Sequence, residues 1–235
     1  MLLTRPEADS RALKAEIEAL GYPVMIEPLL SIEPIMQPKL DLAGVQAVVL
    51  TSAHAVSGLT EDAKACTIYT VGDATAAAAR KAGCRSVHVA AGNAKKLSQM
   101  LVEKCRSQDG TILHLSGEVV REGLAEFLQK SGFDYRRQPV YRAKARACFS
   151  DEVIDAWRRR AIRAVLLFSP RTSVTLVDLL RRHELVGYVD KAAAICLSEE
   201  TAAPCKTVAW SRIIQAARPT SHALIGALVG SITIC

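Results

Sequence analysis

The stretch Val48-Val49-Leu50-Thr51-Ser52-Ala53 is an apolar run of strand length that ends in two hydroxyl residues. The stretch Val165-Leu166-Leu167-Phe168-Ser169-Pro170 has the same layout. Short apolar runs bounded by polar residues are typical of strands buried on both faces of a parallel sheet. Each run is followed by a helical stretch, another apolar run and a Thr-Ala pair, at Thr75-Ala76 and Thr201-Ala202. The repeated layout predicts an α/β fold.

Further apolar runs alternate with amphipathic stretches along the chain. The expected strands are Leu2–Thr4, Val24–Leu30, Val48–Thr51, Thr67–Val71, Val87–Ala90, Ile112–Ser116, Val165–Ser169, Ala192–Leu197 and Val208–Trp210. Helices are expected over Ala8–Leu20 and Thr172–Leu180, and from Ala53, Ala74, Ala94, Glu122 and Thr220. Strands and helices that alternate through short connections indicate doubly wound parallel sheets.

A second segment also occurs twice. Thr4-Arg5-Pro6 leads through Gly21 to Pro28, and Ser116-Gly117-Glu118 leads through Gly132 to Pro139. In both copies the glycine precedes the proline by seven residues. The two repeated segments therefore follow one another in the order A, B, A′, B′, which indicates an internal duplication. Chance likeness between ordinary α/β units is the alternative, and it is the better explanation for any one segment taken alone.

The composition narrows the class of protein. The 235 residues are 50% hydrophobic but only 5% aromatic, and the formal net charge of +6 favours acidic partners. No basic tract interleaves with aromatic residues, so nucleic-acid binding is not indicated. The seven cysteines include no C-x-x-C pair, and none of the five histidines has metal-ligand spacing with them. We expect reduced thiols, no metal, no membrane span and a cytoplasmic location.

Small hydroxyl and glycine residues stand at the ends of the expected strands. In open parallel sheets this carboxyl edge, together with the helix N-termini that follow it, forms the ligand crevice. Its free backbone N–H groups favour anions, although plain helix capping is the better explanation for any one hydroxyl. The sequence has no dinucleotide-binding glycine loop, Walker lysine motif or nucleophile elbow. These features predict a cofactor-free, bilobal protein that binds a molecule with several carboxylates or phosphates.

The same residues resemble the pattern of the uroporphyrinogen-III synthase family, in order and over nearly the whole chain. The segments that carry the resemblance are Leu3-Thr4-Arg5-Pro6, Val49-Leu50-Thr51-Ser52, Val71-Gly72-Asp73-Ala74-Thr75-Ala76, Gly92-Asn93-Ala94, Ser116-Gly117 through Arg121-Glu122, Pro139-Val140-Tyr141, Phe168-Ser169-Pro170 and Thr201-Ala202. One departure is Leu197-Ser198-Glu199-Glu200-Thr201, where family members often have a Gly-x-Thr turn.

The resemblance implies two doubly wound parallel-sheet lobes from an internal duplication, joined by a two-stranded hinge. Residues 1–32 and 144–235 would form one lobe, residues 36–138 the other, and residues 29–35 and 139–143 the hinge. The implied reaction closes hydroxymethylbilane, a linear tetrapyrrole with many carboxylates, to uroporphyrinogen III. The last pyrrole ring is inverted and water is lost, without a metal or organic cofactor. A monomer that receives its substrate by transient hand-over from hydroxymethylbilane synthase is expected.

The resemblance also implies roles for individual residues. Tyr141 is similar to the family tyrosine proposed to assist departure of the hydroxyl group, since a protonated phenol can donate a hydrogen bond to the leaving oxygen. A tyrosine that only packs the linker is the alternative. The residues expected to bind substrate carboxylates are Arg5, Thr51, Ser52, Thr75, Ser116, Gly117, Arg121, Ser169 and Thr201.

Two other classes fit parts of this pattern. A non-enzymatic bilobal anion-binding protein would share the duplicated lobes and the hinge, and an inactive homologue would share the motifs as well. A nucleotide-dependent transferase is disfavoured by the missing phosphate loop. An assay for isomer III of uroporphyrinogen separates the enzyme from both alternatives.

Overall fold

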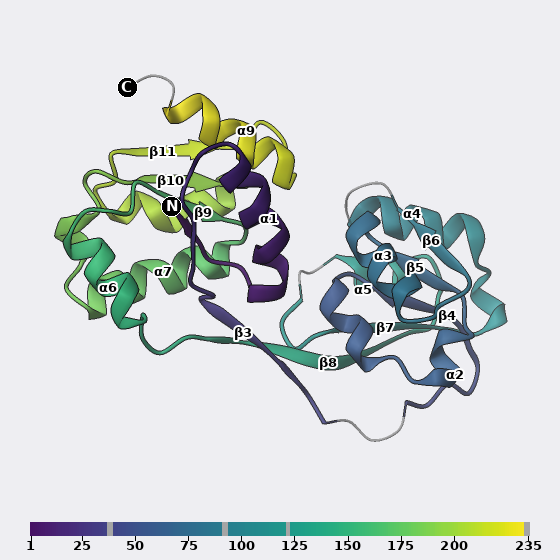
Figure 1. Cartoon of the computed structure of the whole chain (residues 1–235). Coiled ribbons are helices and arrows are strands. Elements are labelled where there is room, and N and C mark those ends of the chain that lie inside the picture. Colours follow the sequence, from purple (N-terminus) through teal and green to yellow (C-terminus); the bar gives the residue numbers. More distant parts are fainter. Residues whose placement is uncertain (37–39, 91–93, 121–122, 233–235) are drawn as a thin grey trace. The chain divides into compact units, whose positions relative to one another are not determined.

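A computed structural model describes residues 1–36, 40–90, 94–120 and 123–232. The chain divides into two compact units. The first unit comprises Met1–Ser31 and Lys144–Cys235, and the second comprises Ile32–Ala143. The first unit is therefore built from both ends of the chain, with the second inserted between them (Figure 1).

The first unit contains a five-stranded sheet whose strands all pair in parallel. Its strands are β1 (Leu2–Leu3), β2 (Met25–Ile26), β9 (Ala164–Leu167), β10 (Ala193–Cys196) and β11 (Arg212–Gln215). They lie in the order β11-β10-β9-β1-β2. The central strands are buried throughout, which explains why they read as continuous apolar runs.

Helices cover both faces of this sheet. They are α1 (Glu7–Ala19), α6 (Asp151–Arg158), α7 (Pro170–Arg182), α8 (Glu199–Ala202) and α9 (Ser221–Ile232). Alternate strand residues enter different cores: Val165 packs with residues of α6 and α7, whereas Leu166 packs with residues of α1 and α9. Two separate cores on opposite faces are what a doubly wound sheet requires.

The second unit contains a six-stranded sheet in the order β3-β8-β7-β4-β5-β6. The strands are β3 (Leu30–Pro34), β4 (Val45–Leu50), β5 (Ile68–Thr70), β6 (Val87–Val89), β7 (Thr111–Gly117) and β8 (Tyr135–Ala145). The pairs from β8 to β6 are parallel. By contrast β3 runs antiparallel to β8. As the chain advances along β3, its contacts move backward along β8: Ser31 contacts Lys144, Glu33 contacts Arg142, and the Ile35 N–H donates a hydrogen bond to the Val140 carbonyl.

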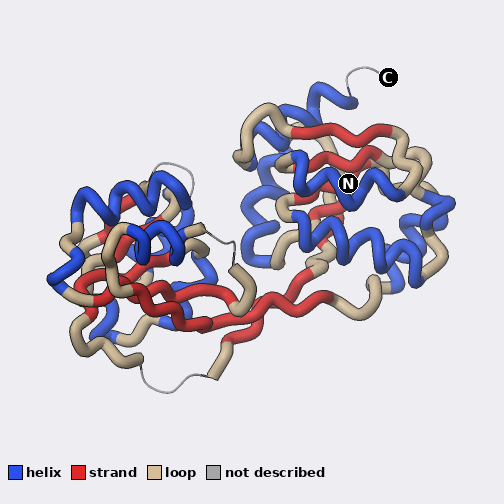
Figure 2. Tube along the Cα trace, turned by 180° about the vertical axis from the view of Figure 1, so that it is seen from behind, coloured by secondary structure: helices blue, strands red, loops and turns tan. Residues whose placement is uncertain are grey.

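The second sheet is also covered on both faces. Its helices are α2 (Glu61–Lys64), α3 (Asp73–Lys81), α4 (Ala94–Lys104) and α5 (Leu124–Lys130), with a 3-10 helix over Ala53–Gly58. Val48 and Leu50 pack toward α2 and α3, whereas Ala47 and Val49 pack toward α4 and α5. Figure 2 shows helices on both sides of the strands within each unit.

The two sheets have matching strand orders, as a duplication predicts. In the first sheet, β11-β10-β9 of segment B′ are followed by β1-β2 of segment A. In the second sheet, β6-β5-β4 of segment B are followed by β7-β8 of segment A′. The first unit therefore combines segment A with segment B′, and the second unit combines segment B with segment A′.

Some elements differ from the sequence expectation. The prediction of a strand over Val208–Trp210 is wrong. The last strand of this sheet is β11, and Val208 and Trp210 instead pack in the core formed with α6 and α7. The run Val24–Leu30 is split between β2 and the start of β3, and a 3-10 helix replaces the helix expected from Ala53. The helix start expected at Glu122 lies outside the described residues. Within the described ranges, no helix is long and apolar enough to cross a bilayer.

Candidate active site

A hollow of about 360 Å³ lies at the carboxyl edge of the second sheet. Thr51 and Ser52 follow β4, Val71 follows β5, and Gly117 ends β7, so neighbouring parallel strands all reach it. The residues that line it are Thr51, Ser52, Val71, Ala94, His114, Gly117, Val119, Val120, Leu124 and Tyr141. Its position is the one expected for the ligand crevice of an open α/β sheet.

Tyr141 reaches this hollow from β8 and lies directly against the backbone of Gly117. A Cβ atom added to Gly117 would lie 2.9 Å from Cζ of Tyr141 and 3.0 Å from its hydroxyl oxygen. The phenol ring also meets the ring of His54 edge to face, with 5.7 Å between the ring centroids. Gly117 thus leaves the space that the phenol occupies, and the two residues are placed by pairing of β7 with β8.

A buried histidine connects the hollow to the interior of the unit. Nε2 of His114 lies 3.0 Å from the hydroxyl of Thr51, and Nδ1 lies 2.7 Å from the hydroxyl of Tyr135. Burial, with a smaller contribution from the positive charge of Arg137, lowers the pKa of His114 to about 4. The imidazole is therefore neutral at physiological pH, with one nitrogen donating a hydrogen bond and the other accepting one.

Tyr135 favours one of the two neutral forms of this imidazole. A phenol is a better hydrogen-bond donor than an aliphatic hydroxyl, so the Tyr135 hydroxyl is expected to donate to Nδ1 of His114. The proton of the ring then resides on Nε2, which donates to the Thr51 oxygen. This arrangement leaves the Thr51 hydroxyl proton free to point into the hollow, where it can donate to an anion.

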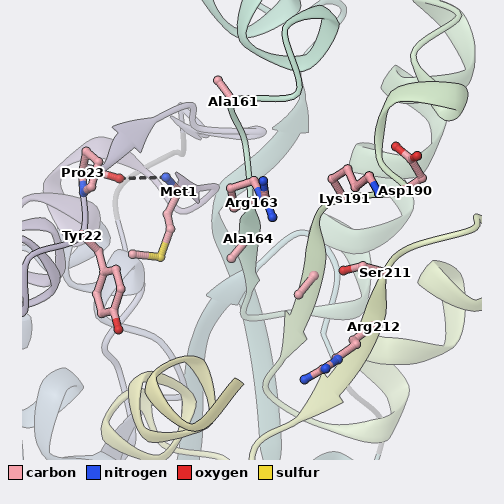
Figure 3. Close-up of a pocket in the computed structure, with 11 residues that line it drawn as sticks. Met1, Tyr22, Pro23, Ala161, Arg163, Ala164, Asp190, Lys191, Ser211 and Arg212 are labelled. Carbon is pink, nitrogen blue, oxygen red and sulfur yellow. Dashed lines mark hydrogen bonds between the residues drawn. The ribbon is translucent and has the colours of Figure 1, made fainter. Parts of the chain in front are cut away.

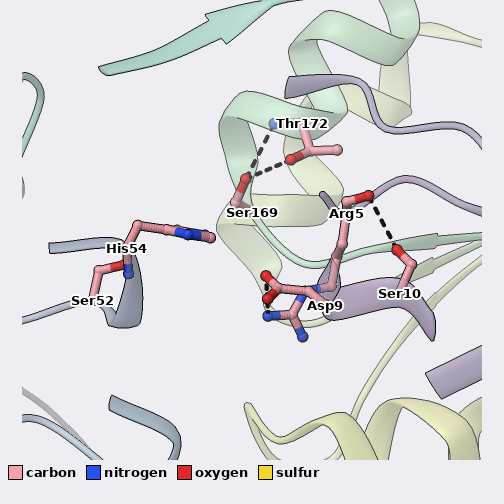
Figure 4. Close-up of polar contacts among 7 residues, drawn as sticks. All are labelled: Arg5, Asp9, Ser10, Ser52, His54, Ser169 and Thr172. Atoms are coloured by element: carbon pink, nitrogen blue, oxygen red, sulfur yellow. Dashed lines mark hydrogen bonds and ion pairs between the residues drawn. The ribbon is translucent and has the colours of Figure 1, made fainter. Parts of the chain in front are cut away.

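In the first unit, Ser169 caps a helix and Arg5 forms an ion pair (Figure 4). The Ser169 hydroxyl accepts from the backbone N–H of Thr172 at 3.2 Å and caps α7. Arg5 forms an ion pair with Asp9 at 3.1 Å, and its guanidinium lies 4.8 Å from the centre of the Phe168 ring. Asp9 thus offsets much of the charge that Arg5 could offer an anion.

Thr201 and Ser52 take part in the same kind of local structure. The Ser198 hydroxyl accepts from the Thr201 N–H at 3.3 Å, and Thr201 itself is almost completely buried. The Ser52 hydroxyl accepts from the His54 N–H at 3.3 Å, yet Ser52 also lines the hollow. Helix capping accounts for the hydroxyls of Ser169 and Ser198, and for Ser52 capping and ligand contact are compatible.

The structure brings together four of the predicted site residues in the second unit: Thr51, Ser52, Gly117 and Tyr141. Thr75 is buried within α3 and does not line the hollow. The hydroxyl of Ser116 is buried and donates to the Gly117 carbonyl at 2.9 Å. Arg121 lies outside the described residues.

His114 was not predicted to belong to this site, because the histidines were assessed only as possible metal ligands. The available indication was its position: a histidine between Leu113 and Leu115, in the middle of an apolar strand, must be buried and must find polar partners. Its partners Thr51 and Tyr135 belong to the two neighbouring strand segments, so only the sheet order reveals them.

Comparisons with known proteins agree with this architecture. A family model described as Uroporphyrinogen-III synthase HemD matches residues 11–226. Among solved structures, uroporphyrinogen-III synthetase from Helicobacter pylori is similar, with a TM-score of 0.63, 15% identity and coverage of 90% of this chain and 93% of that chain. A mutant uroporphyrinogen III synthase from Thermus thermophilus gives a TM-score of 0.55 at 17% identity and covers 100% of this chain and 99% of that chain.

A search of curated proteins gave no match to this chain. The two solved structures share less than a fifth of their residues with it, so their likeness concerns the fold. The family model, in contrast, matches all but ten residues at the start and nine at the end of the 235. The chain therefore belongs to the uroporphyrinogen-III synthase family, whose members are cyclising lyases of tetrapyrrole biosynthesis.

Proposed function

We propose that this protein closes hydroxymethylbilane to uroporphyrinogen III, and that the hollow of the second unit holds the reacting end of the chain. The observation that carries this proposal is the Tyr141 phenol, which lies on Gly117 beside Thr51 and Ser52 at the carboxyl edge of a parallel sheet. A volume of about 360 Å³ falls at the small end of the range for small-molecule sites. It suits one end of a four-ring chain.

The first step breaks the carbon–oxygen bond of the terminal hydroxymethyl group. The Tyr141 hydroxyl donates its proton to the leaving oxygen, which departs as water, and the electron-rich pyrrole that loses it becomes a cationic, N-protonated azafulvene. The other terminal pyrrole attacks through its substituted carbon to give a spiro intermediate, which opens and recloses with the ring inverted. Loss of a proton from the reclosed ring restores the aromatic pyrrole and reprotonates the phenolate, so the net loss is one water.

The other residues of the hollow position the substrate and limit side reactions. The Thr51 hydroxyl, oriented by neutral His114, and the backbone N–H groups near Ser52 offer hydrogen bonds to a substrate carboxylate. The apolar side chains of Val71, Val119 and Leu124 reduce access of water to the azafulvene. Unguided closure gives the uninverted isomer, so holding the chain in the right geometry is the main contribution of the protein.

The remaining predicted residues and the lobe assignment belong to the same proposal. Ser169, Thr201 and Arg5 of the first unit remain predicted carboxylate ligands. The proposed lobes are residues 1–32 with 144–235, and residues 36–138. The division of the chain into units supports them, because it falls after Ser31, inside the proposed hinge segment 29–35, and after Ala143, at the end of the proposed hinge segment 139–143. Free thiols at the six described cysteines suit a reducing compartment such as the cytoplasm.

The test of this function is an assay with freshly made hydroxymethylbilane. Uroporphyrinogen isomers I and III are separated after oxidation, with and without the protein. We expect isomer III to dominate and its yield to rise with protein concentration. An isomer ratio equal to that of the protein-free control would contradict the proposal and would favour an inactive homologue or an anion-binding protein.

Replacing Gly117 by alanine tests the placement of the phenol. The added Cβ would lie within 3.1 Å of three atoms of Tyr141, so the ring must shift by several tenths of an ångström. We expect turnover to fall roughly tenfold while the protein stays folded, because small misplacements of a reacting group are costly. Gly187→Ala is the matched control, since nothing lies within 4 Å of its added Cβ. Equal rates for Gly117→Ala and wild type would remove the support that Gly117 gives to the proposal.

A further inference from the structure

A second, larger hollow of about 630 Å³ lies at the opposite edge of the first sheet, where the strands begin. It is formed by residues at or just before the starts of β1, β2, β9, β10 and β11. The caps at Ser169 and Ser198 follow β9 and β10 and so lie at the other edge. This hollow therefore has no part in the site proposed for ring closure.

Two alanines in neighbouring strands create the space. Ala164 of β9 pairs with Ala193 of β10, and Ala193 pairs with Arg212 of β11. On the other side Leu2 pairs with Val165, so Met1 stands opposite Ala164. Residues paired across parallel strands project from the same face, which gives one transverse row of Met1, Ala164, Ala193 and Arg212. The small central pair, itself buried, leaves room beside an apolar floor made by Met1, Tyr22 and Pro23.

Three cationic side chains surround this floor. Arg163, Lys191 and Arg212 belong to the starts of three adjacent strands, and Figure 3 shows them around the hollow. Within the part of the chain that the structure describes, none of them has an ion pair or a side-chain hydrogen bond. The nearby carboxylate of Asp190 pairs with Arg160 and so is already engaged.

None of these three cations lies in the last turn of a helix, where a cation neutralises the C-terminus. That role belongs to Arg158 in the last turn of α6 and to Arg181 and Arg182 in the last turn of α7. Arg163 and Lys191 stand outside these last turns, next to the starts of β9 and β10. Three like charges placed on adjacent strands repel one another, so an anion bound among them would relieve the repulsion.

We propose that this hollow binds an amphipathic anion, with a carboxylate or phosphate head held by Arg163 and Lys191. The short apolar body packs against Met1, Tyr22 and Pro23. The volume is in the range of small-molecule sites, and the combination of an apolar floor with convergent charges is their usual composition. An inorganic anion alone would leave the floor unused, and a neutral alkyl chain would leave the charges unpaired.

Calorimetric titration with matched probes tests this site. Octanoate and octyl phosphate carry the two candidate heads, whereas 1-octanol and inorganic phosphate each lack one half of the ligand. We expect one octanoate or octyl phosphate per chain, with binding weakened by salt and at least about tenfold weaker binding of both half-ligands. The tighter of the two amphiphiles identifies the head group.

Variants place the binding within the hollow. Arg163→Gln with Lys191→Gln should weaken the favoured probe by about tenfold or more, through loss of charge-assisted hydrogen bonds. Arg158→Gln with Arg159→Gln removes the same charge from exposed positions at the same end of the sheet and should leave the affinity within about twofold. Equal weakening by both pairs, several probes bound per chain, or inorganic phosphate binding as tightly as octyl phosphate would each overturn the proposal.

Discussion

Tyr141→Phe is expected to slow formation of uroporphyrinogen III by about 100-fold, the lower end of the range for loss of a general acid. The substitution removes only the hydroxyl, so the ring still packs on Gly117 and against His54. The effect should therefore appear in kcat with KM little changed, because carboxylate binding is assigned to other groups. Spontaneous closure competes as the enzyme slows, so the fraction of isomer I should rise in parallel. Initial rates and isomer ratios measured together provide this test.

Tyr188→Phe is the matched control for this change. Tyr188 is exposed, and its ring lies 5.7 Å from the Arg160 guanidinium, a contact that does not need the hydroxyl. The rate of the Tyr188→Phe variant should equal that of wild type. A wild-type rate in Tyr141→Phe as well would show that Tyr141 only packs β8 and would remove the proposed acid.

Combining Tyr141→Phe with Gly117→Ala separates two explanations of a slow enzyme. If Gly117 acts by placing the phenol, alanine at 117 has little left to disturb once the hydroxyl is gone, and the double variant should be no slower than Tyr141→Phe alone. Multiplying effects would mean that the two residues act independently. Far-UV circular dichroism of all variants checks that each remains folded.

The fold could be predicted from the sequence wherever burial dictates residue type. The runs around Val48 and Val165 are apolar because helices cover both faces of their strands. The last strand escaped prediction because β11 lies at an edge, where Arg212 and Gln215 remain exposed and give no apolar run. The more hydrophobic Val208 and Trp210 nearby pack into a core without forming a strand.

Those residues of the candidate site that lie at the ends of strands could be predicted from the sequence. Thr51, Ser52 and Gly117 meet because parallel strands bring their carboxyl ends to one edge. Tyr141 was placed only by resemblance, and its contact with Gly117 depends on a register shift between Ser116 and Gly117 that no local pattern indicates. The contacts of His114 depend equally on which strands become neighbours.

His114 should make the second unit sensitive to acid. The pKa of His114 is about 4 in the folded chain, against an ordinary value of 6.5. Between these pH values the unfolded chain binds a proton that the folded chain does not. The free energy of unfolding therefore falls as the pH drops from about 6.5 toward 4, and the contribution of neutral His114 to stability is fully present above about pH 6.5. The free energy of unfolding decreases by about 3 kcal/mol across this pH window. Protonation would also remove the acceptor that the Tyr135 hydroxyl uses at Nδ1 of His114.

Hydrogen exchange of the β7 amides in the full chain measures this effect locally, which matters because two units need not unfold together. The opening free energy of β7 in wild type should decrease by about 3 kcal/mol between pH 7 and pH 4. In His114→Gln the histidine part of this slope should be absent, even if the variant is less stable throughout. His88→Gln, at an exposed histidine of the same unit, should keep the wild-type slope. If the slopes of wild type and His114→Gln coincide, His114 is not held neutral by the fold, and the orientation proposed for the Thr51 hydroxyl loses its basis.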